Sequence, residues 1–287
     1  MKKLIFVPIF LALIIVFTTQ CLNKQTANAP KSAAVIPMKQ THKEAADTLL
    51  ADAEAPLKPL IYKVLNRQQA IAFLTSNNLD TLFNSAYPEN GFYGEDRYRI
   101  EYLFESSKRD EHDPTLYHIK GRNRYKKTIT PFSGTIRITQ LSEFTDPNLD
   151  TAEVNGMNIR NLYAAQGEFE FKEDSIAKSS GIFKGTLKME FNTRTDAYPT
   201  ELWFYSKNLP SGGGGYRMDG TWASYTNKTL VKPVILGRDL FRFANDILKD
   251  FSYGEREIEI NPKYRSLGWE SFWENDEWWH EAEKPKM

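Results

Sequence analysis

Cysteine is almost missing from this chain of 287 residues, which contains Cys21 alone. Proteins of oxidising compartments often carry paired cysteines, and disulfide-rich scaffolds depend on them. No disulfide can form within a chain that has one cysteine, so a hydrophobic core must hold the fold. The length is sufficient for such a core, in one large domain or two small ones.

An excess of one charge is missing as well. Lys and Arg together number 37, and so do Asp and Glu, which gives a formal net charge of zero. Domains that bind nucleic acid usually carry a strongly basic surface. The balance therefore argues against nucleic acid as a partner.

The sequence also lacks the motifs of common enzymes. It has no Gly-x-Ser-x-Gly elbow and no HExxH pair. The glycine run at 211–215 lacks the ending of a phosphate-binding loop, so we interpret it as a flexible connection. A glycoside-type hydrolase stays a less favoured alternative, for which Asp219 and Glu274 are the candidate acids. We predict a protein that is not an enzyme and needs no cofactor.

A metal site is not predicted either. The run from Asp110 to Asp113 offers four potential ligands, but adjacent residues are difficult to aim at one ion, and a turn before Pro114 explains their polarity. His118 has no second histidine at metal spacing, so we expect it to have a hydrogen-bonded structural role.

A hydrophobic run long enough to cross a membrane, which takes roughly 20 residues, is not found. The apolar run from Leu4 to Phe17 is shorter and follows Lys2 and Lys3, which is the order of an export signal. Cys21 comes shortly after it. A cleavage after Ala29 and an uncleaved anchor remain alternatives to processing at the cysteine.

In its placement Cys21 resembles the acylated cysteine of bacterial lipoproteins, although Thr18, Thr19 and Gln20 differ from the usual residues before it. The resemblance implies a signal peptide at 1–20 and a lipid such as palmitate on Cys21. It also implies a protein attached by this lipid to a membrane of the cell envelope, the outer membrane being favoured.

Residues 21–59 are rich in Ala, Lys, Thr and Pro and have few large apolar residues, which is typical of a tether. We expect a single β-rich domain over 60–287. Asn66 is a plausible N-cap for a helix that extends to Leu74. The apolar spacing near residues 239–249 predicts an amphipathic helix.

Between these helices, apolar and polar residues alternate with the period of a β-strand. In 97–104, for example, Arg99 and Glu101 are expected on a solvent-exposed face. Gly134, Gly167 and Gly185 recur at positions that suggest a curling sheet, as does Gly220. The predicted strands are 97–104, 115–121, 132–141, 162–171, 181–191, 201–206 and 216–225.

This pattern predicts a mainly β fold, an antiparallel meander that forms a barrel or half-barrel, with a β-sandwich as the second choice. At the level of pattern it is similar to the lipocalin and calycin architecture. Together with the lipoprotein-like start, the chain resembles envelope lipoproteins of Gram-negative bacteria.

Two groups of residues are candidates for binding. Lys120, Arg122, Arg124 and Lys126 alternate along one strand and form a stripe that suits an anion. The competing interpretation, which we prefer, is a solvated face that pairs with acids such as Glu170 across the sheet.

The second group is aromatic. Exposed tryptophans can stack on sugar rings, but a tryptophan-rich segment can equally be a lid that packs on the domain. On a helix Trp278 would point away from the others, and the lid is the preferred interpretation. The candidate residues are Trp269, Trp273, Trp278 and Trp279, with Trp203 and Trp222 in the strands.

Taken together, the sequence predicts a lipid-anchored envelope protein that binds a small apolar or glycan-like ligand. The alternative is a structural or assembly component that binds other envelope proteins. The exposed area of the tryptophans should distinguish a lid from a binding platform.

Overall fold

The computed structural model describes residues 61–145, 159–177, 179–194, 200–204, 209–243, 252–253, 258–274 and 276–280. Contacts divide the chain into Met1–Ala53 and Glu54–Met287, and every described residue belongs to the second unit. The expected signal peptide, Cys21 and the tether therefore lie outside the described residues.

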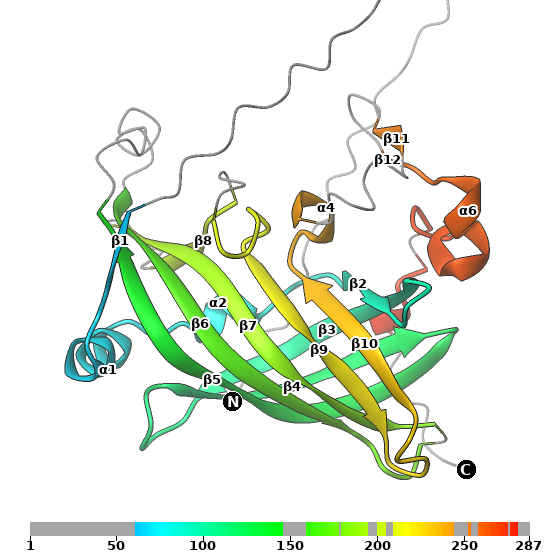
Figure 1. Ribbon diagram of the computed structural model, residues 1–287. Coiled ribbons are helices and arrows are strands. Elements are labelled where there is room, and N and C mark those ends of the chain that lie inside the picture. The colour runs from blue at the N-terminus through cyan, green and yellow to red at the C-terminus, as the bar shows by residue number, and fades with distance from the viewer. Residues whose placement is uncertain are drawn as a thin grey trace, which may run out of the picture. The chain divides into compact units, whose positions relative to one another are not determined.

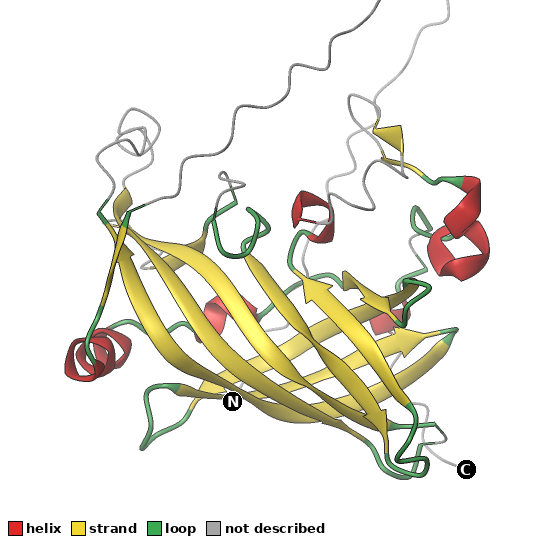
Figure 2. Cartoon of the chain, viewed as in Figure 1, coloured by secondary structure: helices red, strands yellow, loops and turns green. Residues whose placement is uncertain are grey.

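The described chain is mainly β, as the alternation predicts (Figure 2). One antiparallel sheet contains ten strands. They are β1 (Tyr62–Val64), β2 (Glu89–Tyr93), β3 (Tyr98–Arg109), β4 (Leu116–Tyr125), β5 (Thr128–Phe144), β6 (Ile159–Glu173), β7 (Gly181–Arg194), β8 (Thr200–Leu202), β9 (Tyr216–Ser224) and β10 (Val231–Gly237).

The hydrogen bonds of this sheet close into a ring. Neighbouring strands follow the order β5-β4-β3-β2-β10-β9-β7-β6, and β6 pairs again with β5. β1 pairs with β5 and β8 pairs with β7 at the margins. In Figure 1, β6, β7, β9 and β10 cross in front of β3 and β4. Because the ten strands form one sheet, the alternative of two facing sheets does not hold for them.

The inside of the ring holds the main core. Along β3 the side chains of Ile100, Tyr102 and Phe104 point inward and are at most 2% exposed. They meet aromatic residues of β6 and other strands, such as Phe171, whose ring centroid lies 5.3 Å from that of Phe104. Alternation of the side chains across the strands brings these residues to one face of the sheet.

Two helices close one end of this core. α1 (Arg67–Ser76) begins at Asn66, whose side chain accepts a hydrogen bond from Gln69 N at 2.9 Å, as the sequence predicts. α2 (Asp80–Phe83) follows. The Phe83 ring lies 5.5 Å from that of Tyr117, near the β3–β4 turn. The turns after β2, β4, β6 and β9 lie at the opposite end of the ring.

Two strands of the ring, β2 and β10, were not predicted. β2 is short. β10 contains Pro233, which has no backbone N–H to donate, so the sequence around it does not indicate a strand. The structure nevertheless pairs Gly91 with Leu236, which joins β2 to β10 and completes the ring.

Two of the expected glycine positions face each other across β7 and β9. Gly185 pairs with Gly220, and a Cβ atom on Gly185 would lie 2.1 Å from the carbonyl oxygen of Asp219. The strands approach so closely here that neither position has room for a side chain.

The glycine-rich loop before β9 is held in place, in contrast to the flexible connection expected. Ser211 is fully buried, and its N–H donates to Glu190 Oε1 at 2.9 Å. The N–H of Glu190 donates in turn to the carbonyl of Gly215. The loop therefore packs along β7.

After β10 the described elements are short. They are α4 (Leu240–Phe243), β11 (Ser252–Tyr253), β12 (Ile258–Glu259), α6 (Pro262–Tyr264), η1 (Arg265–Trp269) and η2 (Trp278–His280). The helix predicted over 239–249 is described as far as Phe243, and its remainder lies outside the described residues. None of the described helices has the length and apolar character needed to cross a membrane.

Candidate functional site

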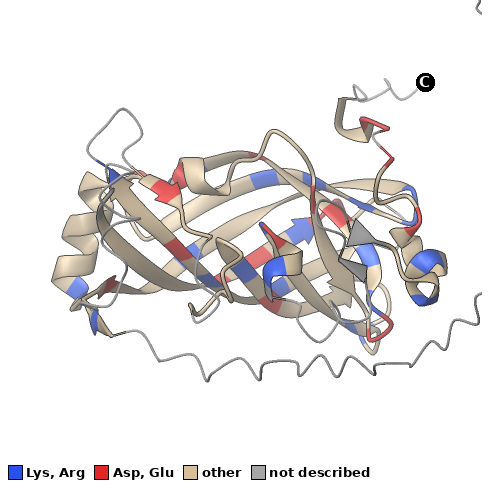
Figure 3. Ribbon diagram, turned by 90° about the horizontal axis from the view of Figure 1, so that it is seen from above, with Lys and Arg blue, Asp and Glu red and all other residues tan. Residues whose placement is uncertain are grey.

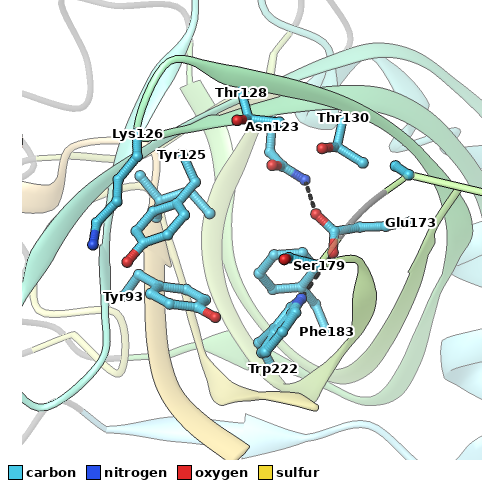
Figure 4. Close-up of a pocket in the computed structure, with 12 residues that line it drawn as sticks. Tyr93, Asn123, Tyr125, Lys126, Thr128, Thr130, Glu173, Ser179, Phe183 and Trp222 are labelled. Atoms are coloured by element: carbon cyan, nitrogen blue, oxygen red, sulfur yellow. Dashed lines mark hydrogen bonds between the residues drawn. The ribbon is translucent and has the colours of Figure 1, made fainter. Parts of the chain in front are cut away.

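A cavity of about 340 Å³ opens at the end of the ring opposite the two helices. Its lining comes from the strand ends that meet there. Figure 4 shows the side chains around it. They include Tyr93 from β2, Asn123 and Tyr125 from β4, Thr130 from β5, Glu173 from β6, Phe183 from β7 and Trp222 from β9.

Aromatic rings form one side of this cavity. The ring centroid of Tyr93 lies 4.5 Å from that of Tyr125 and 5.6 Å from that of Trp222. Burial raises the pKa of Tyr93 further above neutrality than the usual value of about 10. The three residues reach the cavity because each is at or near the end of its strand.

A carboxylate faces the rings from the other side (Figure 4). Glu173 Oε1 accepts a hydrogen bond from Asn123 Nδ2 at 2.7 Å. Its Oε2 accepts from Trp222 Nε1 and from Gly181 N, both at 2.8 Å. Burial raises the pKa of Glu173, and these donors counteract the rise.

The cavity mouth carries two lysines in a tight turn. Lys126 and Lys127 connect β4 to β5, and both have positive φ angles, of 48° and 68°. Lys126 lines the cavity, and its Nζ lies 5.3 Å from the ring centroid of Tyr125 and 4.8 Å from that of Tyr98.

The Trp-rich segment, residues 262–274 and 276–280, packs on the outer face of the ring. Trp269 is fully buried against Phe92 and Phe241, and its Nε1 donates to the carbonyl of Arg97 at 3.1 Å. Gly268 has a φ of 82° and lies against the ring of Tyr98. Its positive φ allows the segment to turn onto the sheet.

This segment also covers the face of β3 that was expected to be exposed to solvent. Arg99 is only 7% exposed, and its guanidinium lies 5.3 Å from the ring centroid of Phe272. It donates to Glu101 Oε1 at 2.9 Å, and Glu101 is 9% exposed. The prediction of a wet face was wrong at these residues, because a distant segment of the chain covers them.

The two arginines of the basic stripe, both on β4, form ion pairs with acidic residues. Arg122 pairs with Glu105, and Arg124 pairs with Glu101 and with Asp276 of the Trp-rich segment. Figure 3 shows basic and acidic residues intermixed along the strands. Lys120 is exposed. The prediction that acids such as Glu170 on β6 pair with this stripe was wrong, because β6 pairs with β5 and β7 rather than with β4.

The tryptophans do not form one row. Trp278 is 3% exposed and lies under Arg124, whose Cζ is 5.3 Å from its ring centroid, although a helix would have pointed it away. Trp279 is half-buried, and its carbonyl accepts from Arg122 Nη2 at 2.6 Å. Trp273 is 57% exposed.

Trp203 and Trp222 are also separated. Trp203 is buried in an outer cluster with Phe144 and Leu162, whereas Trp222 lines the cavity. Sequence reasoning singled out Trp222 but missed Tyr93, Asn123, Tyr125 and Glu173. Each of these residues lies at or near the end of a strand. No sequence motif marks such positions.

The remaining candidates lie elsewhere. His118 Nε2 lies 2.8 Å from Asp110 Oδ2, in the hydrogen-bonded arrangement expected for it. Asp219 forms an ion pair with Arg217, Glu274 is exposed, and neither residue lines the cavity. No cluster of metal-ligating side chains is found among the described residues.

The geometry thus identifies a cavity with aromatic rings on one side and a buried carboxylate on the other. Comparisons of the chain with protein-family models, with curated proteins and with solved structures find no match.

Proposed function

We propose that this protein is a binding module whose cavity holds a small molecule. The observation that carries the proposal is the convergence of Tyr93, Tyr125 and Trp222 with Asn123 and Glu173 around one opening. Ligand sites are typically concave, mostly apolar and provided with a few oriented polar groups, and volumes of roughly 300–1,000 Å³ are common.

The ring supports this proposal because it offers a rigid frame. Small closed sheets either fill their interior with side chains or hold one small ligand. Here the helix-covered end is filled by residues such as Leu74 and Phe83, and the cavity lies at the other end. We take the domain to be a lipocalin-like barrel that binds its ligand at the mouth.

The proposed ligand has an apolar or ring-shaped body with polar groups. Aromatic side chains provide faces for such a body, and the amide and carboxylate can orient its polar groups. We also propose that Cys21 carries a lipid that anchors the protein to the cell envelope, on the strength of the sequence around it.

The test is whether the cavity retains a molecule through purification. Native full-length protein should carry a co-purifying small molecule in mass spectrometry. Thr128 lines the mouth and is exposed, so Thr128→Trp should block the cavity and remove that molecule.

The matched control is Thr221→Trp, which adds the same side chain at an exposed position of β9 that does not line the cavity. It should retain the molecule. Native protein that carries nothing and binds no member of a small-molecule panel would contradict the proposed function.

A further inference from the structure

The cavity contains a negative charge that the described residues leave without a positive partner. Glu173 accepts hydrogen bonds from Asn123, Trp222 and the backbone of Gly181, all of which are neutral. Within the described ranges, no lysine or arginine forms an ion pair with it. Burying a carboxylate without a counter-charge is costly, and the raised pKa of Glu173 reflects that cost.

The same carboxylate retains capacity for a ligand. Two oxygens offer about four acceptor positions in all. Oε2 receives two donors, from Trp222 and Gly181, whereas Oε1 receives one, from Asn123. One position on Oε1 therefore receives no donor from the described residues and is left for a positively charged group of a ligand.

The aromatic side adds a second attraction for positive charge. The faces of Tyr and Trp rings carry negative electrostatic potential and attract cations within about 6 Å. The mouth already shows this interaction, because Lys126 Nζ lies within that range of Tyr125 and Tyr98. In Figure 4, Lys126 extends along the side of Tyr125 that is remote from Glu173.

We propose that the cavity binds a small organic cation, with its ammonium group between the Glu173 carboxylate and the rings of Tyr125 and Trp222. This inference rests on the proposed binding function and narrows it to one ligand class. A neutral ligand would leave the charge of Glu173 uncompensated, whereas a cation gains from the carboxylate and from the rings together.

The experiment compares two probes of nearly equal shape. Choline carries a trimethylammonium group, and 3,3-dimethylbutan-1-ol carries a neutral tert-butyl group in its place. Binding to the full-length protein is measured by calorimetry and by Trp fluorescence. We expect choline to bind at least about tenfold more tightly than the alcohol.

Variants locate the source of this preference. Glu173→Gln keeps the size of the side chain and removes its charge, so the preference for choline should fall to about twofold or less. Lys126→Asn removes a positive charge from the mouth in a turn that suits Asn, so choline should bind two- to fivefold more tightly. Lys127→Asn, in the same turn but outside the cavity lining, should have a smaller effect.

Lys126→Asn keeps the inference testable even if Glu173→Gln fails to fold, because Lys126 is exposed. Equal affinity for both probes, tighter binding of the alcohol, no binding of choline, or weaker choline binding in Lys126→Asn would overturn the cation assignment. The ligand-binding function would still stand if a neutral molecule co-purified with the native protein and was lost in Thr128→Trp.

Discussion

Buried glutamates differ in how their surroundings accommodate them. Glu89 is paired with Arg238 and accepts from Tyr102 and Tyr216 inside the ring. Glu190 is fully buried and receives two hydrogen bonds from Ser211. Burial raises the pKa of each. Glu173 also accepts hydrogen bonds from within the protein, but unlike Glu89 and Glu190 it lines the cavity.

Glu190 should make stability depend on pH. Burial raises its pKa to about 7, above the value of about 4.3 expected for an unfolded chain. The protonated acid is therefore favoured in the folded state. The contribution of Glu190 to the free energy of unfolding is complete below about pH 4. This contribution, about 3 kcal/mol, is lost as the pH rises through 7.

The measurement is the free energy of unfolding of wild type and Glu190→Gln between pH 4 and pH 8. From pH 4 to pH 8 the free energy of unfolding should fall by about 3 kcal/mol more in the wild type than in the variant. Glu95→Gln, at an exposed turn position, is the control. If the free energy of unfolding depended on pH in the same way for wild type and Glu190→Gln, Glu190 would not titrate as expected.

At the scale of elements, the β4–β5 turn has a conformation that its residues disfavour. A two-residue hairpin turn with positive φ at both positions is usually formed by Asn-Gly. Here Lys126 and Lys127 occupy it. A left-handed conformation costs a residue with a side chain roughly 1–2 kcal/mol.

Lys127→Gly should therefore raise the free energy of unfolding by about 1 kcal/mol, as measured by urea denaturation. Lys108→Gly, at an exposed position within β3, should lower it by about 0.5–1 kcal/mol, because glycine weakens a strand. A loss of stability in Lys127→Gly would mean that the Lys127 side chain contributes more than its backbone conformation costs.

The Trp-rich segment is held on the sheet by the packing of Trp269. Trp269 fills a cluster between the segment and the outer face of β2, together with Phe92 and Phe241. Trp269→Ala should reduce the free energy of unfolding by about 3–5 kcal/mol, because it leaves a cavity in that cluster.

Trp273→Ala is the matched control, since more than half of this side chain is exposed. It should change stability by less than about 0.5 kcal/mol in the same unfolding experiment. Similar decreases in the free energy of unfolding of both variants would contradict the view that packing of Trp269, and not of Trp273, holds the segment on the sheet.

At the scale of the whole molecule, we predict that the proposed anchor and the proposed binding site act independently. Cys21→Ser should abolish incorporation of a labelled fatty acid, because the Cys21 thiol is the proposed acceptor, and should leave ligand binding unchanged. Radiolabelling in cells and mass spectrometry of the purified protein measure the two effects. Unchanged labelling of Cys21→Ser would refute acylation at this residue.

Several elements could be predicted because they depend on local sequence. Period-two alternation identified most strands, and Asn66 identified the start of α1. β10 was missed because Pro233 opposes a strand locally, while its neighbours β2 and β9 stabilise it through pairing. Pairing partners far apart in the chain leave no local signal.

The sequence by itself determined that the chain can form no internal disulfide and that it is mainly β, whereas the lipoprotein-type start stays a prediction. Only the tertiary structure decided that β2 and β10 complete a ring, that the Trp-rich segment buries Arg99 and Glu101, and that Glu173 meets Tyr93 and Tyr125. The physical reason is that backbone alternation is local, whereas the cavity forms where the ends of strands distant in sequence converge.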